Sequence, residues 1–165
     1  LKISEEIRKI LLNPDNSAMN FETEALLMTA SRAQLTEEVI RPLLVKGFFV
    51  IADRFSDSTL AYQGGGRKLD LNILKKINSF ATKNLVPDIT FLIDIKPEDA
   101  MMRSGLTSPD RIEGAGIDLQ KDVQKTYLSL AKEFSNRFII LDGYDSISSI
   151  HSIILDKIIN YSYED

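Results

Sequence analysis

Cysteine and tryptophan are absent from the 165 residues, and histidine occurs once, as His151. Without cysteine the chain forms no disulfides, thiolate metal sites or cysteine nucleophile. A single histidine excludes a histidine-rich metal centre, and we expect His151 to be structural. No apolar run approaches the roughly 20 residues of a membrane span, and no segment resembles a signal peptide. We therefore expect a cytoplasmic protein with no membrane partner.

The residues that are present have the proportions of an ordinary globular protein. Hydrophobic residues make up 44% of the chain and charged residues 27%, which is typical of soluble domains. The length suits one domain, residues 1–165, with a sizeable core. The net charge of −4 argues against a general nucleic-acid binder.

Helical periodicity recurs along most of the chain. Apolar residues return every three or four positions in five stretches. Pro42 falls inside the longest of these and should kink it or end it early. Pro97 suits the first position of a further short helix. The five periodic stretches are 3–11, 20–45, 69–82, 119–134 and 146–161, so six helices are predicted in all.

Three continuous apolar runs, 48–52, 89–93 and 138–141, predict strands buried on both faces of a parallel sheet. Their alternation with helices predicts an α/β fold with right-handed crossovers.

The end of the run 48–52 is the first candidate site, because ligands of open α/β sheets bind beyond the carboxyl ends of the strands. Asp53 and Arg54 follow the run directly, and the triplet 64–66 is all glycine. A carboxylate suits a metal or its waters, a guanidinium suits an anion, and a glycine loop can turn backbone N–H groups toward an anion. Alternatively, Asp53 caps the loop, Arg54 pairs with surface carboxylates, and the glycines form a mobile turn.

The wider pattern resembles the signature of thymidylate kinases, which transfer the γ-phosphoryl group of ATP to dTMP. The resemblance rests on four segments, in this order: Glu24-Ala25-Leu26-Leu27-Met28-x-Ala30-x-Arg32-Ala33-Gln34; Asp53-Arg54-Phe55-x-x-Ser58-x-x-Ala61-Tyr62-Gln63-Gly64-x-Gly66-Arg67; Pro87-Asp88-Ile89-Thr90; and Asp110-Arg111-Ile112-Glu113. It implies a three-layer P-loop kinase-type fold with a central parallel sheet, helices on both faces and a lid.

The resemblance implies roles around the acceptor phosphate and sugar. Arg54 would hold the phosphate of dTMP, and Asp53 would act on Mg²⁺ directly or through water. Tyr62 would lie near the sugar, where its bulk disfavours a ribose 2′-hydroxyl, while Ser58 and Gln63 would contribute polar contacts. Tyr62 could otherwise be a half-buried core aromatic.

The resemblance also implies a base site on the helix 20–45. Arg32 would hydrogen-bond thymine. Four residues earlier the family usually has a phenylalanine that stacks on the base, and this chain has Met28. A thioether packs on an aromatic face without planar stacking. We therefore expect Met28 to affect how tightly the base binds, not which base is recognised. Ordinary core packing is the alternative for Met28.

The break at about 105–116 is similar to the lid over the phosphate donor. Arg103 and Arg111 would neutralise charge on the transferred group and help exclude water. The alternative is a solvated loop with internal ion pairs. The family often carries further arginines on the next helix, but residues 120–125 have none.

The phosphate loop of such kinases is missing from these residues. No G-x-x-x-x-G-K-[ST] occurs, nor does the Glu-Pro-Gly-Gly-Thr segment of the family. We expect the first strand, phosphate loop and first helix to lie upstream of Leu1; a true fragment is the alternative.

The leading hypothesis is a homodimeric dTMP kinase that uses ATP and Mg²⁺, with the apolar face of 20–45 at the dimer interface. The alternatives are a kinase for another nucleoside monophosphate and an inactive nucleotide-binding module.

Overall fold

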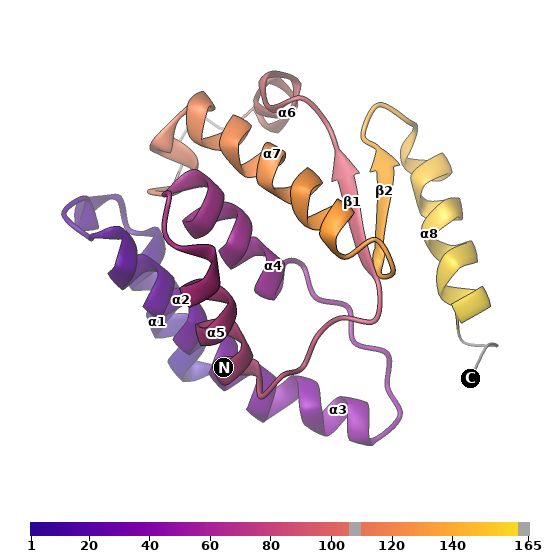
Figure 1. The fold of residues 1–165 in the computed structure, drawn as a ribbon, viewed down its shortest axis with the longest axis horizontal. Coiled ribbons are helices and arrows are strands. Elements are labelled where there is room, and N and C mark those ends of the chain that lie inside the picture. Colours follow the sequence, from indigo (N-terminus) through magenta and orange to yellow (C-terminus); the bar gives the residue numbers. More distant parts are fainter. Residues whose placement is uncertain (106–109, 162–165) are drawn as a thin grey trace.

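The computed structural model describes residues 1–105 and 110–161, which form mainly helices beside a two-stranded parallel sheet (Figure 1). The elements in chain order are α1 (Lys2–Leu12), the 3₁₀ turn η1 (Pro14–Asn16), α2 (Phe21–Leu35), the π-helical turn η2 (Thr36–Ile40), α3 (Arg41–Val45), α4 (Ser56–Thr59), the π-helical segment η3 (Leu60–Gly66), α5 (Leu71–Thr82), β1 (Thr90–Asp94), α6 (Pro97–Ser104), the 3₁₀ turn η4 (Glu113–Ala115), α7 (Ile117–Glu133), β2 (Phe138–Asp142) and α8 (Ile147–Tyr161).

The sheet confirms two of the three predicted strands. β1 and β2 pair in parallel, from Thr90 opposite Phe138 to Asp94 opposite Asp142. The helix α7 contacts both strands, and α8 lies beyond β2, away from the other helices (Figure 1). Since the described sheet has two strands, the three-layer arrangement with a central sheet stays a prediction.

The predicted strand at 48–52 is wrong. This run is irregular, with Phe49 71% exposed and Ile51 89% exposed. A strand is held by hydrogen bonds to a neighbour, and within the described ranges only β1 and β2 pair with each other. Apolar sequence is therefore not sufficient here: within the described ranges the run pairs with neither β1 nor β2.

The long helix predicted at 20–45 is α2, η2 and α3 in succession. Asn20 caps its start by accepting a hydrogen bond from Thr23 N at 2.8 Å. Pro42 lies in the first turn of α3, and the π-helical turn η2 comes just before it. In a π-helical turn the backbone hydrogen bonds join residues five apart instead of four. This change occurs directly before Pro42, which has no backbone N–H group to donate. The helical segment therefore does not end at Pro42 but continues to Val45.

The glycine triplet is helical, so the loop predicted there is wrong. Gly64, Gly65 and Gly66 close the segment η3, which packs on α7. A Cβ atom on Gly65 would lie 1.9 Å from Thr126 Oγ1. Because α7 comes this close, the absence of side chains at the triplet is what allows η3 to pack on α7. The end of η3 is closed by a hydrogen bond from the backbone N–H of Arg67 to Tyr62 O at 2.9 Å.

The segment formed by α4 and η3 lies at the centre of the packing. One cluster of buried side chains joins it to α2, α5, α7 and β2, namely Ala25, Leu60, Leu74, Leu130, Ala131 and Phe138. Arg137 fixes it to the sheet, because its guanidinium bonds both carboxylate oxygens of Asp57 at 2.7 and 2.8 Å. In the part of the chain that the structure describes, no helix combines the length and apolar character needed to cross a bilayer.

Candidate active site

Asp53 and Arg54 are exposed and are followed by Phe55, the residue before α4. Arg54 adopts the left-handed conformation, with φ at 68°, which is uncommon for a residue with a side chain. Its guanidinium carbon lies 5.0 Å from the centre of the Tyr62 ring. The structure therefore brings together Arg54 and Tyr62, as their predicted roles beside one nucleotide require.

Arg54 remains a cation in this setting. Desolvation by the surrounding chain lowers its pKa, but the neighbouring phenols of Tyr62 and Tyr127 and the carboxylate of Asp53 outweigh it and raise the pKa above its ordinary value. A guanidinium that is permanently charged and exposed can hold a phosphate with two parallel hydrogen bonds.

Ser58 faces a residue that the sequence did not indicate. Its hydroxyl lies 2.7 Å from the hydroxyl of Tyr127, on α7. Burial raises the pKa of Tyr127, and it outweighs the hydrogen bond with Ser58 and the charge of Arg54, which both lower that pKa. Tyr127 thus stays neutral and adds a second aromatic hydroxyl to the group around Arg54.

Arg32 is held on one side by neutral oxygen atoms. Its Nη1 donates to Thr59 Oγ1 at 2.8 Å and to Asn78 Oδ1 at 3.0 Å, and Asn78 Nδ2 in turn donates to Ser56 O at 3.1 Å. Burial lowers the pKa of Arg32 to about 10, although Tyr127 and Asp57 act in the opposite direction. The Arg32 guanidinium carbon also lies 5.8 Å from the centre of the Phe55 ring, and no hydrogen bond from Nε or Nη2 to the described residues accompanies those of Nη1.

Met28 lies one turn before Arg32 on α2 but borders a different space. It lines a cavity of about 280 Å³ between α1 and α2. The cavity is bordered by Leu1, Ser4, Glu5, Arg8, Leu11, Leu12, Met28, Ser31 and Leu35.

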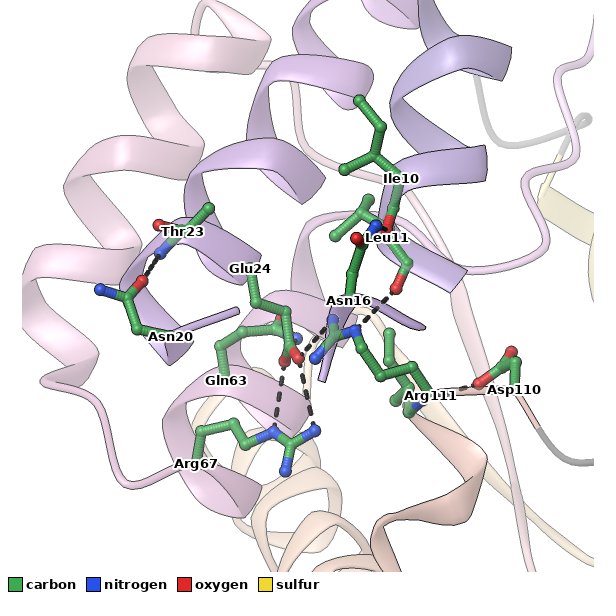
Figure 2. Close-up of polar contacts among 11 residues, drawn as sticks. Ile10, Leu11, Asn16, Asn20, Thr23, Glu24, Gln63, Arg67, Asp110 and Arg111 are labelled. Carbon is green, nitrogen blue, oxygen red and sulfur yellow. Dashed lines mark hydrogen bonds and ion pairs between the residues drawn. The ribbon is translucent and has the colours of Figure 1, made fainter. Parts of the chain in front are cut away.

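Gln63 and Arg111 meet at a buried carboxylate, that of Glu24 (Figure 2). Glu24 is 0% exposed, and Gln63 Nε2 donates to its Oε1 at 2.9 Å. Arg67 donates from Nε and Nη2 to the two oxygens at 3.3 Å each. Arg111 Nη2 lies 2.7 Å from Oε2, as an ion pair without good hydrogen-bond alignment, while its Nε donates to Leu11 O at 2.9 Å.

These donors keep Glu24 ionised. Burial is the largest influence and raises its pKa, but the hydrogen bonds from Gln63 and Arg67 and the paired guanidinium of Arg111 together lower the pKa below its ordinary value. A buried carboxylate with several donors is the expected arrangement, since an unpaired buried charge is strongly unfavourable.

Arg103 lies at the carboxyl end of the sheet. Its Nη1 donates to Gly143 O at 2.7 Å, and its guanidinium carbon lies 5.3 Å from the centre of the Tyr144 ring. Gly143 N donates to Asp94 O at 2.8 Å, so this turn follows both strands. No hydrogen bond, ion pair or ring contact between described residues joins Arg103 or Arg111 to Arg54. The predicted lid contains 106–109, which lie outside the described residues.

The described residues contain no group of three or more acidic, histidine or cysteine side chains that could hold a metal ion by themselves. Asp53 therefore stands as a single exposed carboxylate. Mg²⁺ in kinases is commonly held by one or two carboxylates together with substrate phosphates and waters, and one exposed carboxylate fits that requirement.

Comparison with known proteins places this chain in a family. A family model described as thymidylate kinase matches residues 1–154. Thymidylate kinase of Thermosipho melanesiensis is 48% identical over 152 residues, which cover 92% of this chain and 74% of the relative. Thymidylate kinase of Caldanaerobacter subterraneus subsp. tengcongensis is 44% identical over 160 residues, covering 97% and 76%. That of Chlorobaculum tepidum is 45% identical over 166 residues, covering 94% and 77%. The chain therefore belongs to the thymidylate kinase family.

Proposed function

We propose that this chain catalyses ATP-dependent phosphorylation of dTMP to dTDP. The observation that carries the proposal is the exposed Arg54 guanidinium beside Tyr62, with Asp53 next to it in the chain. Positioning and charge stabilisation dominate phosphoryl transfer. A fixed guanidinium next to an aromatic ring suits a ligand that has a phosphate on a sugar and base.

Arg54 would bind the dTMP phosphate and hold its oxygen in line for attack on the γ-phosphorus of ATP. Asp53 would hold Mg²⁺, directly or through water. A bound Mg²⁺ would offset the charge of the phosphate oxygens.

The base and sugar would lie against residues from α2 and η3. Arg32 would offer Nε and Nη2 to the thymine oxygens, because Nη1 makes its contacts to Thr59 and Asn78. Met28 stays a proposed contact of the base, although here it lines the cavity between α1 and α2. Tyr62 would limit the space at the sugar. Ser58, paired with Tyr127, would add a hydroxyl to this side of the site.

Fewer of the described residues are candidates for binding ATP, the phosphate donor. Arg103 and Arg111 stay proposed ligands of the phosphate donor, although here they contact Gly143 and Glu24. ATP binding also needs backbone N–H groups and a lysine from a phosphate loop. That motif does not occur in the 165 residues.

A homodimer through α2 and α5 is part of the same proposal, as is a cytoplasmic location. Leu26 on α2 is 55% exposed and Phe80 on α5 is 88% exposed. A surface hollow between the two helices is lined by Ala30, Ala33 and Phe80. Exposed apolar groups on adjoining helices favour a self-complementary interface. Analytical ultracentrifugation of the unmodified protein and of Phe80→Glu tests it, and a monomer at all concentrations of the unmodified protein excludes it.

The activity is tested with the protein that contains this sequence, ATP, Mg²⁺ and each of dTMP, dUMP, dGMP and dCMP. We expect dTDP to form and dTMP to be preferred. Turnover without any preference for dTMP would support a kinase for another nucleoside monophosphate. Binding of dTMP without turnover would support the inactive nucleotide-binding module.

A further inference from the structure

The Glu24 carboxylate connects three segments that are distant in sequence. It lies on α2, its partners Gln63 and Arg67 come from η3 and the residue after it, and Arg111 follows the undescribed residues 106–109 (Figure 2). Glu24 and Gln63 are 0% and 2% exposed. Side chains packed to this degree have little freedom to rearrange, so the carboxylate fixes the groups that bond to it.

The contact with Glu24 also determines which way the Gln63 amide faces. An ionised carboxylate has acceptors only, whereas a glutamine amide has an NH₂ donor at one end and an oxygen acceptor at the other. Only the NH₂ end can bond to Glu24 Oε1, at the observed 2.9 Å. The amide oxygen of Gln63 must therefore point away from Glu24, and within the described ranges it accepts no hydrogen bond.

We propose that Glu24 is a positioning residue for base recognition: it fixes the Gln63 amide so that the amide oxygen accepts a hydrogen bond from the N3–H group of thymine. This inference rests on the proposed function, in which Gln63 contacts the nucleoside. It assigns the choice of base partly to a carboxylate that does not touch the substrate.

The chemistry of the bases gives this arrangement a selective effect. Thymine and uracil carry a hydrogen on N3, whereas N3 of cytosine is an acceptor. An amide oxygen held toward N3 attracts the first two bases and opposes the third. Sites built to hydrogen-bond a particular group reject analogues that leave their buried polar atoms unpaired.

Changing Glu24 to glutamine removes the acceptor-only group that fixes the orientation of the Gln63 amide. In Glu24→Gln the new side chain has both a donor and an acceptor, so either end of the Gln63 amide can turn toward it. We expect dTMP and dUMP to bind about tenfold more weakly, which corresponds to the loss of one oriented hydrogen bond. We expect the affinity for dCMP to stay the same or rise, so the ratio of dTMP to dCMP affinity falls.

The experiment measures binding of dTMP, dUMP and dCMP by isothermal titration calorimetry, without ATP. Arg67→Lys is the matched control, because it disturbs the same carboxylate without removing the acceptor for Gln63. We expect its dTMP to dCMP ratio to be unchanged. If Glu24→Gln does not fold, Glu24→Asp replaces it, since the shorter side chain withdraws the carboxylate from Gln63 and keeps the charge. The same fall in the ratio is expected.

A ratio that falls in the Glu24 variant and not in Arg67→Lys supports the inference. Equal weakening of all three nucleotides, or an unchanged ratio, overturns it and leaves Glu24 a structural residue. Failure of the unmodified protein to bind dTMP would instead overturn the proposed function. The two failures are thus distinguishable in one set of titrations.

Discussion

The Arg54 guanidinium carbon lies 5.0 Å from the centre of the Tyr62 ring, although Arg54 precedes α4 and Tyr62 lies in η3. The left-handed backbone at Arg54, with φ at 68°, turns the chain into α4. A non-glycine residue in this conformation is unfavourable by about 1 kcal/mol. The fold thus keeps an arginine where glycine would be easier to accommodate, which is consistent with a role for its side chain.

Arg54→Ala should therefore reduce dTMP binding far more than ATP binding. A bidentate contact to phosphate comprises two charge-assisted hydrogen bonds, so we expect a loss of about 100-fold in dTMP affinity. Binding is measured by calorimetry for each nucleotide separately. Equal losses for dTMP and ATP would mean that Arg54 is a structural residue.

Arg54→Gly is a useful control for folding in this experiment. Glycine adopts a positive φ without a steric penalty, which offsets the lost contact with the Tyr62 ring. We expect its free energy of unfolding to stay within about 1 kcal/mol of the unmodified protein. Its dTMP affinity should fall as far as that of Arg54→Ala.

Asn78→Ala should weaken both the fold and base recognition. Asn78 is buried and joins the Arg32 guanidinium to the Ser56 carbonyl. Leaving these groups without a partner is expected to lower the free energy of unfolding by about 1–3 kcal/mol. Urea denaturation measures this change, and dTMP titration should show weaker binding because Arg32 is less well fixed. Asn72→Ala, at an exposed position of the same helix, should change stability by less than about 0.5 kcal/mol.

The contribution of Glu24 to stability should depend on pH. The folded pKa of Glu24 lies below its ordinary value of 4.5, so the folded state binds fewer protons than the unfolded state near that pH. The stabilisation is present above about pH 4.5 and is lost as the pH falls through the folded pKa.

Glu24→Gln should therefore lower the free energy of unfolding by about 3–5 kcal/mol at neutral pH, because it leaves two buried guanidinium groups without their carboxylate. The difference between the variant and the unmodified protein should narrow as the pH falls below about 4.5. Denaturant unfolding across this range measures it. A difference that is constant with pH would show that the charge of Glu24 is not what stabilises the cluster.

The elements that the sequence predicted correctly are those that local pattern determines. The predicted helix 69–82 is α5, and its start is capped by Asp70, which accepts a hydrogen bond from Ile73 N at 2.9 Å. Apolar runs likewise located β1 and β2. The run 48–52 has the same pattern but is irregular and exposed, since a strand also needs a partner that its own residues do not specify.

The same distinction applies to the candidate site. Arg54 and Tyr62 could be predicted together because they lie in one short motif. Asn78 and Tyr127 could not, because they reach the site from α5 and α7. Glu24 stood within a recognisable motif, but its role depends on donors from distant segments. No signal within α2 identifies those donors.

Gly65→Ala tests whether the glycine triplet is needed for η3 to pack closely on α7. A Cβ atom at this position would lie 1.9 Å from Thr126 Oγ1 and 2.6 Å from Thr126 Cβ, so η3 and α7 must move apart. Overpacking of this kind is expected to lower the free energy of unfolding by about 1–3 kcal/mol or more. Gly64→Ala is the matched control, because its nearest contacts are the flexible ends of Leu71 and Leu74, and we expect a smaller loss. Thr126→Ala removes the closest atom and should restore part of the stability of Gly65→Ala. If Gly65→Ala were as stable as the unmodified protein, the triplet would be a flexible loop, as the sequence alone predicted.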